Sequence, residues 1–160
     1  VFPLEILPWV AVGSATFHMI VSLAVWLLFY FIFLGIPPLS IFLLPLIILP
    51  LVLLTLGFSW LLASLGVFFF FLAQIIGVVT TVLLFLSPIF YPIVALPEEY
   101  RPFMQINPLT FAVEQARNVM IWGQSVDWGM WLTYSILAIV VAWLGFAWFQ
   151  KTRKGFADVL

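Results

Sequence analysis

Apolar residues occur in this chain in long continuous runs rather than in alternation with polar residues. No Asp, Glu, Lys or Arg lies between Glu5 and Glu98. A transmembrane helix needs about 20 apolar residues to cross the bilayer, whereas the strands of a membrane barrel alternate with a period of two. The pattern therefore predicts a membrane protein that is built from helices.

Four of these runs are long enough to cross a membrane. The segment GIPPLS is expected to form a turn after the first run, and Pro45 and Pro50 are expected to kink the first half of the second. We therefore expect an all-α membrane protein, with residues 1–160 forming one transmembrane domain. The four transmembrane helices are predicted at residues 9–34, 41–65, 74–93 and 130–149.

Residues 94–129 are too polar to span a bilayer and too apolar to form an ordinary loop. The Asn107–Pro108 pair is a typical helix start, and Gly123 is a natural stop. Glu114 and Arg117 lie three residues apart on this helix and can pair. We expect a short amphipathic helix that lies in the membrane interface or dips into it.

The charges at both ends of the last span predict the orientation of the chain. The tail, residues 150–160, contains Lys151, Arg153 and Lys154 against Asp158, whereas residues 94–129 carry two more acidic than basic residues. Cytoplasmic segments are enriched in Lys and Arg, so the tail is expected to be cytoplasmic and residues 94–129 to lie outside. Four spans place the N-terminal end in the cytoplasm as well.

Three charges are crowded into residues 98–101, between prolines, after a long uncharged stretch. They are Glu98, Glu99 and Arg101. On this topology they mark the place where the chain leaves the bilayer on its outer side.

Composition agrees with a membrane protein and excludes several other classes. The 160 residues are 66% hydrophobic and 7% charged, with a mean hydropathy of +1.31, whereas soluble domains have about 25% charged residues. The absence of cysteine excludes a disulfide or thiolate metal site, and the net charge of −1 does not indicate nucleic-acid binding. The chain begins at Val1 without a signal-peptide pattern, and we expect that the start of a longer protein is missing.

Polar residues inside the first span form a stripe with a spacing of four, at Ser14, His18 and Ser22. An ionisable residue in a membrane span is a functional hypothesis, but a neutral imidazole can also hydrogen-bond to a neighbouring helix while serines allow close packing. The abundant aromatic residues are expected to face lipid or the interface, or alternatively to line a path for sugar rings. The candidate channel-lining residues are Ser14, His18, Ser22, Trp26 and Tyr91.

The sequence predicts no catalytic residues and no metal site. Glu98 and Glu99 are adjacent rather than convergent, and His18 is a single histidine without a cysteine to complete a metal site. No glycine-rich phosphate loop is present, so any ATP hydrolysis is expected on another chain.

Four stretches in order along the chain resemble the membrane subunit of type-2 ABC exporters. The similarity is greatest to permeases that export cell-surface polysaccharides and polyol phosphates, such as O-antigen, capsule and teichoic acid. It covers essentially the whole chain but only the C-terminal two-thirds of the usual permease. The stretches are VFPLEILP at 1–8, LSPIFYP at 86–92, LPEEYRPFMQINPLTFAVEQAR at 96–117 and GFAWFQKTRKGFADVL at 145–160.

The resemblance implies helices three to six of a six-helix permease in the bacterial cytoplasmic (inner) membrane. It implies a homodimer that works with two cytoplasmic ATPase subunits, and those subunits bind ATP and Mg²⁺. The implied substrate is a lipid-linked glycan, and the permease is also in contact with membrane lipid. Glu5 would contact the ATPase, and residues 94–129 would form two re-entrant helices that gate the outer mouth. The outer-gate candidates are Glu98, Glu99, Arg101, Glu114 and Arg117, which could alternatively only pin the fold of this segment.

One stretch departs from the family pattern. The sequence GVFFFFLAQ has Phe70 and Phe71 where the family usually has an Arg-Asp pair in a cytoplasmic turn. Charged residues resist entry into the bilayer, so their loss predicts a less firmly fixed turn and weaker contact with the ATPase.

Three other functions stay open beside glycan export. The same fold could export a drug or a lipid, or the chain could be a truncated membrane fragment or scaffold that does not transport. A membrane enzyme is the least supported, because the outer segment lacks a convergent acid–base pair.

Overall fold

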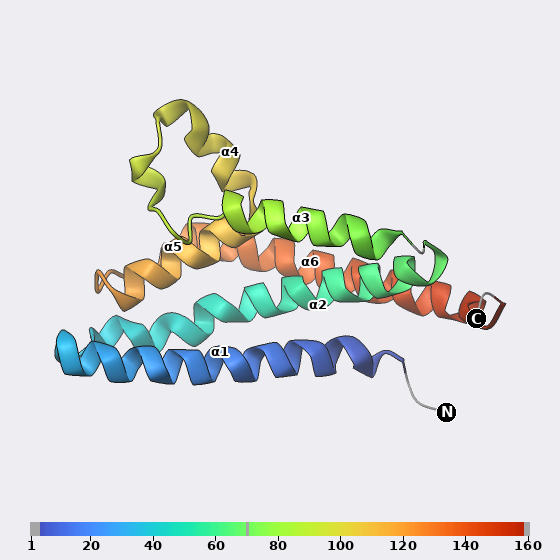
Figure 1. The fold of residues 1–160 in the computed structure, drawn as a ribbon, viewed down its shortest axis with the longest axis horizontal. Helices are drawn as coiled ribbons and strands as arrows, with labels where there is room; N and C mark the ends of the chain where they lie inside the picture. The colour runs from blue at the N-terminus through green and yellow to red at the C-terminus, as the bar shows by residue number, and fades with distance from the viewer. Residues whose placement is uncertain (1–3, 70, 159–160) are drawn as a thin grey trace.

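The computed structural model describes residues 4–69 and 71–158, and every regular element within these ranges is a helix. The long helices run up and down beside one another, with the start of α1 and the end of α6 at the same end of the molecule (Figure 1). The six α-helices are α1 (Ile6–Phe33), α2 (Leu44–Phe68), α3 (Leu72–Leu86), α4 (Arg101–Ile106), α5 (Pro108–Met120) and α6 (Trp128–Thr152). The 3₁₀ turns are Leu39–Leu43, Ile93–Ala95, Glu98–Tyr100 and Arg153–Asp158.

Among the described residues, three helical segments are long and apolar enough to cross a membrane: Ile6–Phe33, Leu39–Phe68 and Trp128–Phe156. They overlap three of the four expected spans, and the last segment continues to Phe156, seven residues past the expected end at residue 149. A chain with three such segments is a multi-pass membrane protein.

The remaining expected span, residues 74–93, is shorter than the sequence pattern indicated. Residues 74–93 were expected to be helical, but α3 ends at Leu86, and its 15 residues rise only about 22 Å. The helix stops because Ser87 precedes Pro88 and takes an extended conformation with ψ 140°. A total of four spans therefore stays a prediction.

The expected effect of Pro45 is corrected by the structure. Pro45 lies in the first turn of α2, where its missing N–H costs no helical hydrogen bond, so it starts the helix instead of kinking it. Pro50 does lie inside α2, and its side chain is fully buried.

The centre of the molecule is the contact between α2 and α6, which cross at two glycines. A Cβ atom added to Gly145 would lie 2.2 Å from the carbonyl oxygen of Gly57, and one added to Gly57 would lie 2.7 Å from the backbone of Ala142. The two backbones therefore touch without side chains between them, as small residues allow in membrane helix pairs.

The flanking helices α1 and α3 are much less buried than this central pair. In α1 only Pro8 and Val12 are buried, and every residue of α3 is at least partly exposed. In Figure 1 they lie on opposite sides of α2. Their apolar surfaces suit contact with lipid or with further membrane helices, because neither environment penalises exposed hydrocarbon.

Candidate functional site

The chain between α3 and α6 folds around a buried hydrogen-bond pair. The Asn107 side chain donates from Nδ2 to Ser87 Oγ at 3.0 Å, and its Oδ1 accepts from the Leu109 backbone N–H at 3.0 Å. Asn107 thus caps the N-terminus of α5 and also holds it against the end of α3. Both side chains are buried, so each polar group needs this partner. The predicted Asn-Pro helix start is confirmed.

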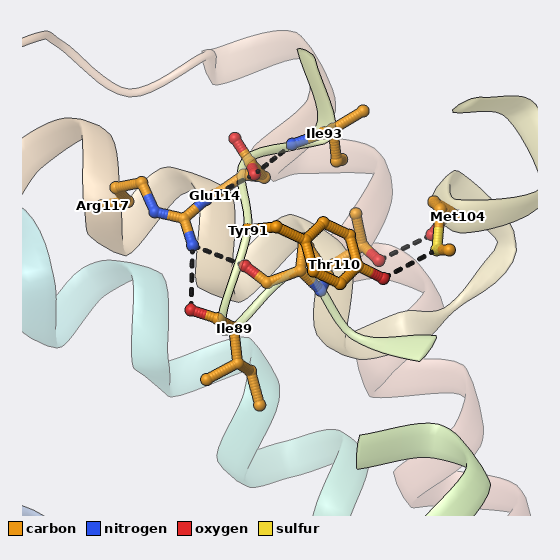
Figure 2. A network of polar contacts seen from close by, with 8 residues as sticks. Ile89, Tyr91, Ile93, Met104, Thr110, Glu114 and Arg117 are labelled. Carbon is orange, nitrogen blue, oxygen red and sulfur yellow. Dashed lines mark hydrogen bonds and ion pairs between the residues drawn. The ribbon is translucent and has the colours of Figure 1, made fainter. Parts of the chain in front are cut away.

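The predicted pair of Glu114 and Arg117 is present and reaches beyond its own helix. Arg117 Nη1 lies 2.6 Å from Glu114 Oε1, which also accepts from the Ile93 backbone N–H at 3.3 Å. Arg117 Nη2 donates to the carbonyl oxygens of Pro88 and Ile89, the latter at 3.2 Å. Figure 2 shows these bonds joining α5 to the loop that follows α3. The pair, with both side chains less than a quarter exposed, fastens that loop.

Tyr91, in the loop that follows α3, forms further polar contacts beside this pair. Its hydroxyl donates to the Phe85 carbonyl at 3.3 Å and lies 3.8 Å from Met104 Sδ, while Thr110 donates to the Met104 carbonyl at 2.6 Å. Figure 2 shows the contact with Met104, and together with the bond to Phe85 it connects the end of α3 to α4. We call the residues from Ser87 to Met120 the fastened segment.

The other charged candidates lie at the exposed start of α4. Arg101 donates to the carbonyl oxygens of Leu96 at 3.1 Å and Val94 at 3.2 Å, and its guanidinium is 3.7 Å from Glu98. The Glu98 side chain is 89% exposed, and Glu99 is exposed as well. An ion pair in water contributes little, so the carbonyl contacts of Arg101 matter more for this turn.

The candidate channel-lining residues do not come together with Tyr91 in this chain. Ser14, His18 and Ser22 are exposed on α1, which packs along α2 on the side away from α3 (Figure 1). Trp26 packs against Tyr30 with the ring centres 4.9 Å apart. A channel lined by these residues stays a prediction.

Glu5 lies at the opposite end of the molecule and is paired within the chain. Its carboxylate forms an ion pair with Arg153 and accepts from Gln150 Nε2 at 3.1 Å, while its carbonyl accepts from Trp60 Nε1 at 3.3 Å. A bond of 2.7 Å between Ser64 and the Thr152 hydroxyl lies nearby on α2 and α6. The start of α1, α2 and the end of α6 are thereby joined. We call this group the terminal cluster.

The turn between α2 and α3 lies at the same end as the terminal cluster (Figure 1). Phe71 is 58% exposed and packs edge-on against Phe69, with the ring centres 6.0 Å apart. Phe70 lies outside the described residues. An exposed aromatic side chain at this position cannot supply the charge that the family pattern has there.

The connection from α5 to α6 is held by Asp127 and Gln115, which the sequence analysis did not single out. Asp127 caps α6 by accepting from the Met130 N–H at 3.1 Å, and Gln115 Oε1 accepts from the Asp127 N–H at 3.2 Å. Gly123 takes φ +64°, a conformation that glycine adopts without strain. An aspartate directly before an apolar run was the available sequence signal for this cap.

The described residues contain no group of three or more histidine and acidic side chains that could hold a metal ion. Charge pairs at the two ends of a helical membrane bundle are instead suited to positioning segments. Such an arrangement can hold or release an opening, but it does not carry acid–base chemistry by itself.

Comparison with known protein families places the chain in one of them. No curated protein matches the chain. The family model described as ABC-2 type transporter matches residues 1–121, which is most of the chain and includes α1 to α5. The chain therefore belongs to the ABC-2 type transporter family of membrane permease components.

Proposed function

We propose that the chain is the permease subunit of an ATP-driven exporter that moves a lipid-linked cell-surface polysaccharide outward across the bacterial cytoplasmic membrane. It works as a homodimer with a cytoplasmic ABC ATPase, and that partner binds ATP and Mg²⁺. Family membership supports the permease role, since ABC-2 permeases generally work with such an ATPase. The sequence motifs that resemble those of polysaccharide permeases support a glycan as the substrate.

The observation that carries this proposal is the fastened segment at the end of the bundle opposite the chain termini. The carboxylate of Glu114 and the guanidinium of Arg117 hold the loop 87–93 closed against α5. In the proposed orientation this segment faces outward, where the polymer leaves, and the terminal cluster faces the ATPase. The segment is then the outer gate, and pinning and gating are two states of the same contacts.

The two ends are connected through α2. The Ser40 hydroxyl donates to the Val119 carbonyl at 2.7 Å, and Val119 packs in a buried cluster with Ile47. A movement of α2 that starts at the ATPase end would therefore carry α5 with it, because packed cores shift as units.

Labelling of single cysteines tests this orientation, because the natural chain has no cysteine. Cysteines at Glu99 and Gln124 are expected to react with an impermeant maleimide in intact cells. Cysteines at Phe71 and Lys154 are expected to react only after the membrane is opened. Labelling of position 154 from outside, or of 71 and 99 from one side, would contradict the proposed topology.

The glycan is tested by deletion of the gene for the full-length protein in its host. Surface polysaccharide is expected to disappear and to return with the wild-type gene. Unchanged polysaccharide together with lost export of a drug or a lipid would assign the alternative substrate, and no change in any export would indicate a chain that does not transport.

A further inference from the structure

A cavity of about 510 Å³ lies between α5 and α6, beside the fastened segment. Its volume is in the range of small-molecule sites, about 300–1,000 Å³. Met130, Thr133 and Leu137 form its α6 wall and are exposed, so the cavity opens along the outer surface of that helix. This is the first part of the α6 span, next to the membrane interface in the proposed topology.

The cavity has a polar wall and an apolar wall. Gln105, Thr110, Glu114 and Gln115 from α4 and α5 supply amide, hydroxyl and carboxylate groups. The other wall is hydrocarbon, from Met130 and Leu137 of α6 and from Ile93. A ligand that satisfies both walls carries a polar head and an apolar chain.

Several polar atoms around the cavity have hydrogen-bonding capacity left. The bonds that Glu114 accepts both end on Oε1, which leaves Oε2, and Gln115 uses its Oε1 for Asp127, which leaves its NH₂ group as a donor. Tyr134 lines the cavity and is 8% exposed, and its hydroxyl has no hydrogen-bond partner among the described residues. That hydroxyl is itself closed off from solvent, so it contributes no group to the open cavity.

The charges of the cavity select the kind of head group. Among the described residues that line it, none is basic, and Glu114 is acidic. The nearest guanidinium, that of Arg117, is committed to Glu114 and the loop carbonyls. An anionic head group would find no cation among these lining residues, whereas the hydroxyl groups of an uncharged head could donate to the remaining oxygen of Glu114.

Two aromatic rings complete the lining. Phe111 and Tyr134 pack with ring centres 4.8 Å apart, and both line the cavity. Aromatic faces suit the C–H surface of a sugar ring, which is apolar although the ring edge is polar. From these features we propose that the cavity binds the uncharged, hydroxyl-rich head group of a membrane amphiphile, with its hydrocarbon chain along Met130 and Leu137.

Lipid retention tests the site without transport. The full-length permease is purified in a sugar-free zwitterionic detergent and mixed with digalactosyl diacylglycerol or with phosphatidylcholine of the same acyl chains. Native mass spectrometry then counts the bound lipid. We expect retention of the galactolipid at least tenfold above that of phosphatidylcholine, and equal retention of the two lipids would overturn the proposal.

The variant Thr133→Leu places hydrocarbon at the polar mouth of the cavity. Its matched control is Thr80→Leu on α3, because both threonines are exposed and both hydroxyls donate to backbone carbonyls of the preceding helical turn. Thr133→Leu is expected to lower galactolipid retention at least fivefold while Thr80→Leu leaves it unchanged. Gln105→Leu, also exposed, is expected to act like Thr133→Leu. Equal effects of Thr133→Leu and Thr80→Leu would overturn the site.

The head group could come from the bulk lipid or from the exported substrate, and a second lipid separates these sources. If a polyprenyl-phosphate-linked sugar displaces the galactolipid and polyprenyl phosphate without the sugar does not, the cavity binds the sugar of the exported substrate and lies on its path. Failure of that lipid to compete, with galactolipid still bound, assigns the site to a bulk glycolipid. Both results support binding of the head group in the cavity. Neither result depends on the export assay, so this proposal can hold even if the proposed function fails.

Discussion

The two ends of the helical bundle are held by ion pairs of different construction. At the end that holds the fastened segment, Glu114 and Arg117 belong to one helix, and their remaining contacts are with backbone groups of a neighbouring loop. At the other end, Glu5 and Arg153 come from opposite ends of the chain and join two helices directly. The first pair shapes a segment, whereas the second holds helices in register.

The two pairs also differ in exposure. The side chains of Arg117 and Glu114 are 17% and 23% exposed, whereas that of Arg153 is 48% exposed. Water screens an exposed pair and weakens it, and salt weakens it further. The pair of Glu114 and Arg117 should therefore be the stronger and the less sensitive to salt.

The largest effect is expected at the crossing that both ends share. Gly145→Ala places a methyl group against the Gly57 carbonyl, so α2 and α6 must separate, at a cost of about 3 kcal/mol or more. Thermal unfolding in detergent measures the loss. The control is Gly66→Ala on α2, where a Cβ meets no described heavy atom within 4 Å outside its own helix, and a small gain is expected there. Equal stability of the two variants would disprove the close crossing.

An intermediate effect is expected from Arg117→Met, which leaves the Glu114 carboxylate half-buried without its cation and frees the loop carbonyls. The expected cost is about 2 kcal/mol. Hydrogen exchange should become faster in residues 87–93 and stay unchanged in the first turn of α1. Arg101→Met is the control. Its ion pair and its carbonyl contacts lie at an exposed turn, so it should cost less, about 1 kcal/mol or below. Faster exchange both in residues 87–93 and in the first turn of α1 would contradict the prediction that the two ends are stabilised independently.

The smallest effect is expected from Arg153→Gln, because its pair is partly screened. We expect a loss of about 1 kcal/mol at low salt that becomes smaller in 0.5 M NaCl, together with faster exchange in the first turn of α1. Lys154→Gln, exposed and adjacent, should change neither quantity. A loss that is independent of salt would mean that Arg153 acts through packing.

The same contrast explains how much of the molecule could be predicted from the sequence. Glu114 and Arg117 are three residues apart on a helix whose Asn-Pro start is visible in the sequence, so their pairing followed from local geometry. The resemblance to the family assigned Glu5 a contact with the ATPase, which stays a prediction, and no spacing rule connects Glu5 to Arg153. Such long-range partners become visible only when the helices are placed.

The helices themselves were predicted better than their ends and their contacts. Length and hydropathy located three spans, because the bilayer sets the minimum number of apolar residues. The early end of α3 was missed, because the apolar run continues through Ser87–Pro88 although the backbone conformation does not. Gly57 and Gly145 were also missed, since a glycine within a helix carries no signal of its partner.

The contact between Gly57 and Gly145 has a mechanical consequence. Because the backbones meet at one point, this point can serve as a pivot for a change in the angle between α2 and α6. Leu44 lies about 20 Å along α2 from it, so a rotation of about 5° moves the helix start by about 2 Å. That displacement is enough to break a hydrogen bond, which lets a small motion at one membrane surface be felt at the other.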